Sequence, residues 1–185
     1  MTASAAHHRN KTLDMAYISL FAILIAMCAW ISVPLVIPFT LQSLGIFLSV
    51  GLLGPGRGLA AVGLYIALGA AGLPLFSGFR GGLGVLLGPT GGYIIGFLLT
   101  AGTIGLFQRL AGRRTWGLAL GMVLGQALCY ACGSLWFQAV YAAQSGAIGF
   151  MAVLGMCAFP YILPDLAKMA VTILLVRRLS PYIKG

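Results

Sequence analysis

Residues 147–179 read AIGFMAVLGMCAFPYILPDLAKMAVTILLVRRL, an apolar run of 33 residues with Asp165 and Lys168 near its middle. As one straight helix this run would be about 50 Å long, whereas the hydrocarbon core of a membrane is about 30 Å thick. Pro160 and Pro164 predict a break in the helix. The run is therefore either two membrane crossings or one crossing preceded by a broken segment.

The rest of the chain is equally apolar. Of its 185 residues, 61% are hydrophobic and 7% are charged, and it contains no Glu. A soluble domain carries roughly 25% charged residues to cover its surface, so lipid must be the solvent for most of this chain. The formal charge of +9 does not indicate nucleic-acid binding, because the basic residues stand singly or in pairs between apolar runs.

Apolar segments and their Pro and Gly boundaries predict six transmembrane helices. The first five span residues 13–31, 41–53, 59–73, 89–106 and 116–142, and the sixth is the last part of 147–179. A Gly-rich stretch, residues 78–88, separates the third helix from the fourth. We expect residues 1–12 to form a disordered cytoplasmic tail and residues 13–185 to form a single six-helix transmembrane domain.

The basic residues favour six crossings over seven. Lys and Arg concentrate on the cytoplasmic side of a membrane protein. Six crossings place nine of the 11 basic residues there: Arg9, Lys11, Arg57, Arg109, Arg113, Arg114, Arg177, Arg178 and Lys184. A seventh crossing would move the last three of these outside. The predicted fold is an all-α membrane protein, a six-transmembrane-helix bundle with both termini cytoplasmic, and its two charge exceptions are Arg80 and Lys168.

Small residues recur at the four-residue spacing that lets membrane helices approach closely. Gly117, Gly121 and Gly125 follow this spacing in the fifth helix, and Gly92 and Gly96 follow it in the fourth. We interpret these glycines as internal packing positions. For Ala22 and Ala26 in the first helix two alternatives stay open, an internal contact and a flat outer face offered to a partner membrane protein.

The sequence lacks the residues of an enzyme or a metal site. No His follows His8, and no nucleotide-binding motif is present. The pair Cys129 and Cys132 has no further Cys or His ligands suited to a metal, so we interpret the cysteines as small core residues. We therefore predict no catalytic residue, no metal and no cofactor, and expect the protein to bind and move a molecule.

Asp165 and Lys168 are three residues apart in the sixth helix and so share one face. Charged groups at membrane depth are costly and usually line a functional cavity. The alternative is an ion pair that only holds the bundle together.

The predicted topology brings further polar residues to the outer half of the membrane, where we expect a ligand cavity. The second, fourth and sixth helices all begin there. A helix amino end exposes N–H groups that bind carboxylates, so the site suits a small anion that also carries N–H donors and a carbonyl. The predicted substrate-binding residues are Thr40, Gln42, Arg80, Thr90, Gly91, Tyr93, Asp165 and Lys168.

Four stretches in this order resemble the biotin-specific S component of energy-coupling-factor (ECF) transporters. They are IPFTLQ at 37–42, GLP at 72–74 leading to RGG at 80–82, LGPTGGY at 87–93 with GF at 96–97, and Pro160 through Asp165 to Lys168. Two positions depart from the family pattern, because Phe79 stands where Gly is expected and Leu163–Pro164 stand where Pro–Gly is expected.

The resemblance implies a multi-pass protein of a prokaryotic cell (inner) membrane that captures biotin from outside. It implies docking, through a small-residue surface that Ala22 and Ala26 fit, to a transmembrane coupling subunit driven by two cytoplasmic ATPase subunits. Asp165 is then expected to accept the ureido N–H groups, and Lys168 or Gln42 to donate to the ureido oxygen. Thr90 to Gly92, with Arg80, would hold the carboxylate.

Three other functions remain as alternatives. An S component for another small anionic vitamin would share the site. A non-transporting membrane scaffold with a structural ion pair would bind no small molecule. A self-sufficient channel or carrier would transport its substrate without partner subunits.

Overall fold

The computed structural model describes residues 2–112, 114–146 and 148–183. Met1, Arg113, Ala147, Lys184 and Gly185, which entered the predictions above, lie outside these described residues. The described chain is mostly helical. Its helices are α1 (Thr2–Trp30), α2 (Gln42–Leu53), α3 (Pro55–Ala70), α4 (Leu83–Leu87), α5 (Gly91–Leu110), α6 (Thr115–Ser145), α7 (Phe150–Cys157) and α8 (Phe159–Ile183), and a two-stranded antiparallel ribbon joins β1 (Ser32–Val33) to β2 (Phe39–Thr40).

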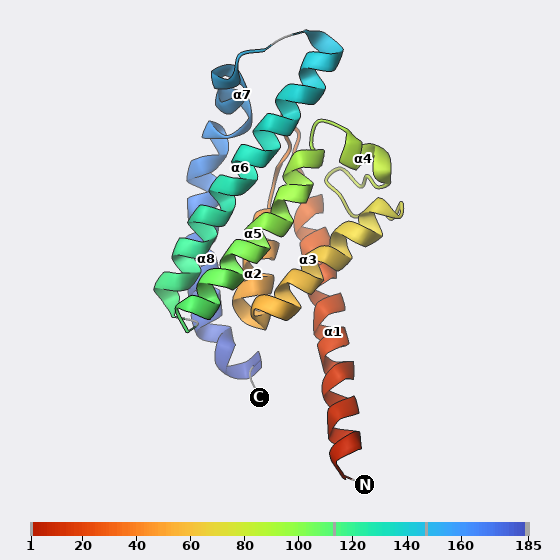
Figure 1. The fold of residues 1–185 in the computed structure, drawn as a ribbon, viewed down its shortest axis with the longest axis vertical. Coiled ribbons are helices and arrows are strands. Elements are labelled where there is room, and N and C mark those ends of the chain that lie inside the picture. The colour runs from red at the N-terminus through yellow and green to blue at the C-terminus, as the bar shows by residue number, and fades with distance from the viewer. Residues whose placement is uncertain (1, 113, 147, 184–185) are drawn as a thin grey trace.

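The long helices form an elongated bundle, and both ends of the chain lie at its lower end in Figure 1. The connections from α2 to α3 and from α5 to α6 lie at this same end. The β ribbon, α4 and α7 lie toward the opposite, upper end. Each predicted apolar segment corresponds to one helix, namely α1, α2, α3, α5, α6 or α8.

Four helices of the described chain are long and apolar enough to cross a membrane. They cover Lys11–Trp30, Gly91–Leu110, Thr115–Ala143 and Phe159–Tyr182. These helices support the predicted fold class, an all-α membrane protein. Helix α2 is shorter, with 12 residues, which gives a length of about 18 Å at 1.5 Å per residue.

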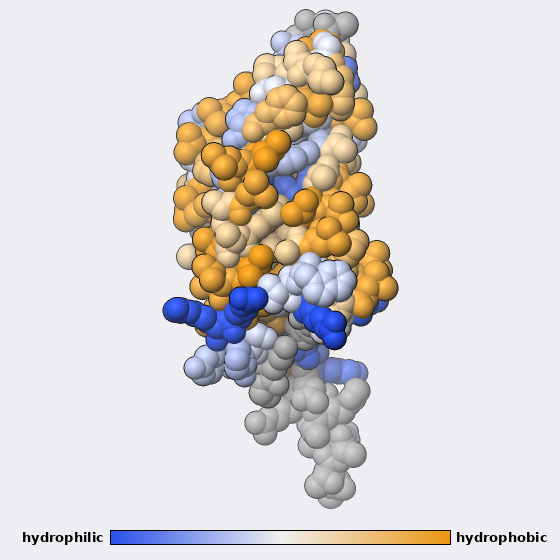
Figure 2. All heavy atoms as spheres, turned by 90° about the vertical axis from the view of Figure 1, so that its left-hand side faces the viewer, coloured by the Kyte–Doolittle hydropathy of each residue, from blue (hydrophilic) through white to orange (hydrophobic). Residues whose placement is uncertain are grey.

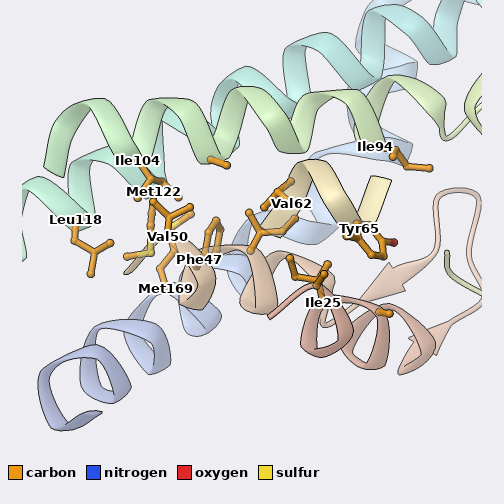
Figure 3. Close-up of a cluster of buried hydrophobic side chains, with 14 of the residues drawn as sticks. Ile25, Phe47, Val50, Val62, Tyr65, Ile94, Ile104, Leu118, Met122 and Met169 are labelled. Carbon is orange, nitrogen blue, oxygen red and sulfur yellow. The ribbon is translucent and has the colours of Figure 1, made fainter. Parts of the chain in front are cut away.

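Helix α2 is short because it lies inside the bundle. Every residue of α2 except Leu44 is buried. Its side chains Phe47 and Val50 pack with residues of the surrounding helices, including Ile25 of α1 and Val62 of α3 (Figure 3). A helix shielded by neighbours on all sides does not have to match the thickness of the lipid core, because protein covers its ends.

Several predicted boundaries differ from the structure. Helix α1 begins at Thr2, inside the segment for which we expected a disordered tail; Ala3, Ala5 and Ala6 are strong helix formers. The Gly-rich stretch contains the short helix α4, which was not predicted.

The final apolar run breaks only once among its described residues. The break lies at Ala158, between α7 and α8, where the backbone leaves helical geometry just before Pro160. Pro160 occupies the first turn of α8, where its missing N–H costs nothing. The prediction of a break at Pro164 is wrong, because Pro164 lies inside α8. Asp165 is therefore not in the first turn of its helix.

Glycines let α5 and α6 pack with their backbones close together. A Cβ atom on Gly121 would lie 2.9 Å from Cα of Ile104, and one on Gly125 would lie 3.0 Å from Cα of Thr100. On the α5 side, a Cβ on Gly96 would lie 2.9 Å from Sγ of Cys129. The internal role predicted for these glycines is confirmed.

We predict that Gly121→Ala lowers the stability of the bundle by about 1–3 kcal/mol, because its Cβ meets backbone that cannot rotate away. The matched control is Gly102→Ala on α5, since a Cβ there meets no atom within 4 Å. This control should leave stability unchanged or raise it by up to about 1 kcal/mol through higher helix propensity. Thermal unfolding of the two purified variants measures both effects, and equal melting temperatures would contradict the prediction.

Candidate ligand-binding site

The site is centred on a buried ion pair on α8. Nζ of Lys168 lies 2.7 Å from Oδ1 of Asp165, and both side chains are less than 10% exposed. The spacing of three residues places both groups on one face of the helix, as the sequence predicted. Burial of two charges is tolerated only where hydrogen bonds satisfy the remaining donors and acceptors.

Three further side chains donate to the Asp165 carboxylate. Oγ of Ser43, on α2, lies 3.0 Å from Oδ1. On the opposite side, Nε2 of Gln126 lies 2.9 Å from Oδ2, and the Tyr130 hydroxyl donates to the same oxygen. Helices α2, α6 and α8 therefore converge on one carboxylate, and each of its two oxygens accepts two hydrogen bonds.

The Lys168 ammonium likewise has an acceptor for each of its three donors. Nζ donates to the backbone oxygen of Thr40 at 2.7 Å and contacts Oγ of Ser43 at 3.0 Å, in addition to Asp165. It also lies 4.5 Å from the centre of the Phe39 ring, a distance that allows a cation–π interaction. Because an ammonium has three donors, these contacts tie α8 to the strand β2 and to the start of α2.

One acceptor in this cluster has no partner. Gln126 is 6% exposed, and its Oε1 atom makes no hydrogen bond among the described residues. A buried acceptor without a partner costs about 1–3 kcal/mol. The amide that donates to Asp165 through Nε2 is therefore prepared to accept a donor from a bound molecule through Oε1.

Two neighbouring cavities, each of about 60 Å³, adjoin this cluster. We call them the ion-pair cavity and the arginine cavity. They share a wall made of Ile37, Pro38, Thr40, Tyr93 and Phe97. The ion-pair cavity is further lined by Ser43, Gln126, Cys129, Tyr130, Cys157, Tyr161, Asp165 and Lys168. The arginine cavity is further lined by Gln42, Phe76, Ser77, Arg80, Val85, Thr90 and Ile94.

The ion-pair cluster can also be approached from the side. A third cavity, of about 200 Å³, lies between α6 and α8 and is lined by apolar residues together with Gln126, Tyr130 and Asp165. Figure 2 shows the face of the molecule that lies on the left in Figure 1, where hydrophilic atoms are visible in a hollow of a mostly hydrophobic surface.

Seven of the eight predicted substrate-binding residues line the two cavities. Gly91 does not belong to either lining. Its N–H donates to the backbone oxygen of Gly88 at 3.0 Å. A Cβ there would lie 1.7 Å from the backbone oxygen of Leu86. Gly91 therefore allows α5 to start close against the end of α4, and the expectation that its amide is free for a ligand is not met.

Hydrogen bonds within the protein hold two of the lining residues, Gln42 and Tyr93. Nε2 of Gln42 donates to the Tyr65 hydroxyl at 2.9 Å. The Tyr93 hydroxyl lies 3.1 Å from Oγ of Ser134 and 3.3 Å from the backbone oxygen of Cys157. These contacts fix both side chains in position before a ligand arrives, which reduces the entropy lost on binding.

Arg80 lies in the exposed loop between α3 and α4. Nε of Arg80 donates to the backbone oxygen of Ser77 at 3.2 Å. The preceding residue, Phe79, has a φ of 56°, in the left-handed region that favours glycine. Phe79 stacks on Trp30 with ring centres 5.0 Å apart. The position where the family pattern has Gly thus keeps a glycine-like backbone, and the aromatic stack supports it.

Ser43, Gln126 and Tyr130 were not among the predicted substrate-binding residues. A signal for them was present. Gln126, Tyr130, Ser134 and Gln138 recur every four residues in an apolar helix, so they form a polar stripe on one face of α6. Polar residues within membrane helices usually face the bundle interior.

The prediction of an outer partner surface at Ala22 and Ala26 is not supported. Their exposed fractions are 3% and 1%, and both belong to the main hydrophobic core. A Cβ on Gly45 of α2 would lie 3.1 Å from Cα of Ile25. The two alanines therefore serve the close contact of α1 with its neighbours, which was the first of the two alternatives.

The chain resembles known proteins over nearly its whole length. Residues 1–185 match the BioY family. The chain is 42% identical over 164 residues to "Biotin transporter BioY" of Thermotoga maritima. The matched region covers 87% of this chain and 92% of that relative. It is 40% identical over 184 residues to "Biotin transporter BioY" of Rhodobacter capsulatus, with 94% of each chain covered.

A solved structure shares the fold. It is the crystal structure of the S-component for biotin from an ECF-type ABC transporter, which matches with a TM-score of 0.82 and 30% sequence identity. The match covers 97% of this chain and 94% of that chain.

We predict that Asp165→Leu lowers the stability of the ligand-free protein by about 3–5 kcal/mol, because it leaves the Lys168 ammonium buried without its anion. The double variant Asp165→Leu/Lys168→Met should recover most of that loss, since replacing a buried pair by apolar residues is often neutral. Thermal unfolding without ligand compares the two. A double variant as unstable as the single one would show that charge pairing is not what stabilises this region.

Proposed function

This chain belongs to the BioY family, and from that premise we propose how its site serves biotin uptake as the S component of an ECF-type transporter. The relatives and the matching structure are named for biotin transport and for the S-component for biotin. The observation that supports the proposal most strongly is the buried Asp165–Lys168 pair at the edge of a cavity, beside the unpaired Oε1 of Gln126.

We propose that the chain crosses the membrane six times, with both termini in the cytoplasm. Both ends of the chain lie at the lower end of the bundle in Figure 1. At this end Arg57 lies in the first turn of α3, Arg109 lies in the last turn of α5, and Arg114 directly precedes α6. Arg177 and Arg178 lie near the end of α8. By the positive-inside rule this end faces the cytoplasm. The binding cavities then open in the outer half, next to the β ribbon and the start of α2.

The ureido ring of biotin suits the ion-pair cavity, because it has two N–H donors and one carbonyl acceptor. Four donors within the protein occupy the acceptor positions of Asp165. A ureido N–H therefore replaces one of the hydroxyl donors, Ser43 or Tyr130, which can rotate toward another acceptor. The second N–H donates to Oε1 of Gln126. Lys168 donates to the ureido oxygen in place of its contact with Oγ of Ser43.

The arginine cavity suits the carboxylate at the other end of the vitamin. Arg80 and Thr90 line this cavity, and Arg80 supplies the cation at a loop that faces the outside. The wall between the two cavities includes the apolar side chains Ile37, Pro38 and Phe97. An elongated molecule with a polar ring, an apolar middle and an anionic end matches this order of surfaces.

We propose that energy for transport comes from partner subunits, a transmembrane coupling subunit and two cytoplasmic ATPases. The sequence contains no nucleotide-binding motif. Because Ala22 and Ala26 are buried, the coupling subunit must dock on other residues. The exposed apolar side of α1, which includes Leu20, Ile23 and Met27, is available for such a contact.

The alternatives differ in what the purified chain binds and transports. A scaffold with a structural ion pair binds no vitamin, and a self-sufficient carrier transports biotin when it is reconstituted alone in liposomes. An S component for another anionic vitamin takes up biotin less well than that vitamin. Mass spectrometry of ligand released from the detergent-purified protein tests for biotin directly, and competition with unlabelled vitamins tests the choice of substrate.

We predict that Asp165→Asn weakens biotin binding tenfold or more, because the amide presents one acceptor oxygen in place of two and a buried ligand donor left unpaired costs about 1–3 kcal/mol. The matched control is Asp14→Asn, which removes the other carboxylate of the chain. Asp14 pairs with Arg57 near the protein surface and is away from the cavities. Isothermal titration calorimetry measures both affinities. Unchanged affinity of Asp165→Asn would remove this residue from the site.

We predict that Arg80→Gln weakens the binding of biotin about tenfold while leaving biotin amide almost unaffected, since the amide has no carboxylate for the guanidinium to bind. The wild-type protein should accordingly bind biotin more tightly than its amide. Equal losses for the two ligands would indicate that Arg80 only shapes the loop.

A further inference from the structure

A separate cavity lies at the lower end of the bundle, away from the site described above. It has a volume of about 330 Å³ and is enclosed by the ends of α2, α5 and α8 and the beginning of α6. Its polar lining residues are Gln108, Thr115, Arg177 and Ser180, and its apolar lining includes Leu118 and Val176. This end of the bundle is the one that we place at the cytoplasmic face of the membrane.

Gln108 gives this cavity an unused hydrogen-bond acceptor. The residue is 2% exposed, and its Oε1 atom has no hydrogen-bond partner among the described residues. A buried acceptor is normally paired, and an orphan one indicates a missing donor. Oε1 of Gln108 can therefore accept a hydrogen bond from a hydroxyl or N–H group of a molecule in the cavity.

Arg177 gives the same cavity a cation. Its Nε atom donates to Oγ1 of Thr115 at 3.4 Å, and a guanidinium carries four further N–H donors on its Nη atoms. These are arranged to bind two oxygens of a phosphate at once. Arg109, next to Gln108 on α5, and Arg178 add to the positive charge of this end. An anion is therefore favoured over a neutral or cationic ligand.

We propose that this cavity binds the headgroup of an anionic phospholipid from the cytoplasmic leaflet, with its phosphodiester on Arg177 and a headgroup hydroxyl donating to Oε1 of Gln108. A lipid fits better than a soluble anion for two reasons. Leu118 and Val176 extend the lining with apolar surface, and basic pockets between helices on the cytoplasmic side are the usual sites for anionic headgroups. Phosphatidylglycerol has this chemistry, whereas phosphatidylcholine has the phosphodiester but no headgroup donor.

The test measures the melting temperature of the full-length protein in detergent while phosphatidylglycerol, phosphatidylcholine or inorganic phosphate is added. A ligand that binds only the folded state raises the melting temperature with its concentration. Phosphatidylglycerol should stabilise the wild type, and Arg177→Gln should weaken its apparent affinity about tenfold. The matched control, Arg178→Gln, removes the same charge one residue away from a side chain that does not line the cavity, and it should behave like the wild type.

Gln108→Leu gives a second, independent readout. It removes the orphan acceptor with little change of volume, so the variant should fold at least as well as the wild type. It should also lose the preference for phosphatidylglycerol over phosphatidylcholine. All three variants should keep the biotin affinity of the wild type, which separates this proposal from the function proposed above.

Three results would overturn the proposal. Equal losses for Arg177→Gln and Arg178→Gln would indicate a diffuse basic surface with no specific site. Equal stabilisation of the wild type by phosphatidylcholine would remove the headgroup donor from the explanation. Equal stabilisation by inorganic phosphate would identify a free anion, and not a lipid, as the occupant.

Discussion

The cost of burying charge in an apolar bundle governs the organisation of this protein. Asp165 and Lys168 lie buried on one helix, and burying two charges is tolerated only where each has close partners. The donors and acceptors come from α2, α6 and the end of β2. The segment of β2 and α2, helix α6 and helix α8, which are distant in sequence, are thus fixed to one another at the proposed binding site.

This requirement explains why α2 is short and central. Ser43 contacts both members of the ion pair, so α2 begins at the level of the site. The β ribbon covers the distance above it and brings the Thr40 carbonyl to Lys168. Helices α1, α3, α5 and α8 pack around α2 and bury every one of its residues except Leu44. The same arrangement leaves room above α2 for the two cavities.

The close contact of α5 with α6 has a related consequence for the site. Glycines on both helices bring the backbones together, while α8 keeps fewer close approaches to α6 and leaves a lateral cavity between them. Gln126 and Tyr130 face α8 from a helix that is held rigidly on its other side. Their positions are therefore set mainly by the packing of α5 on α6. A rigid wall opposite the ion pair favours selective binding, because a ligand cannot improve a poor fit by moving it.

The sequence by itself determined that lipid is the solvent for most of the chain, where the six apolar segments lie, and that Asp165 and Lys168 share one helix face. Composition and helical spacing are local properties of the chain, so they can be read without the fold. It also contained the polar stripe of α6, which periodicity alone could have identified. Only the tertiary structure decided which polar groups meet. Ser43 and Gln126 reach Asp165, Gly91 turns toward α4, and Ala22 and Ala26 face inward. Spacing fixes which residues share a face of a helix, but the direction in which that face points depends on contacts between segments distant in sequence.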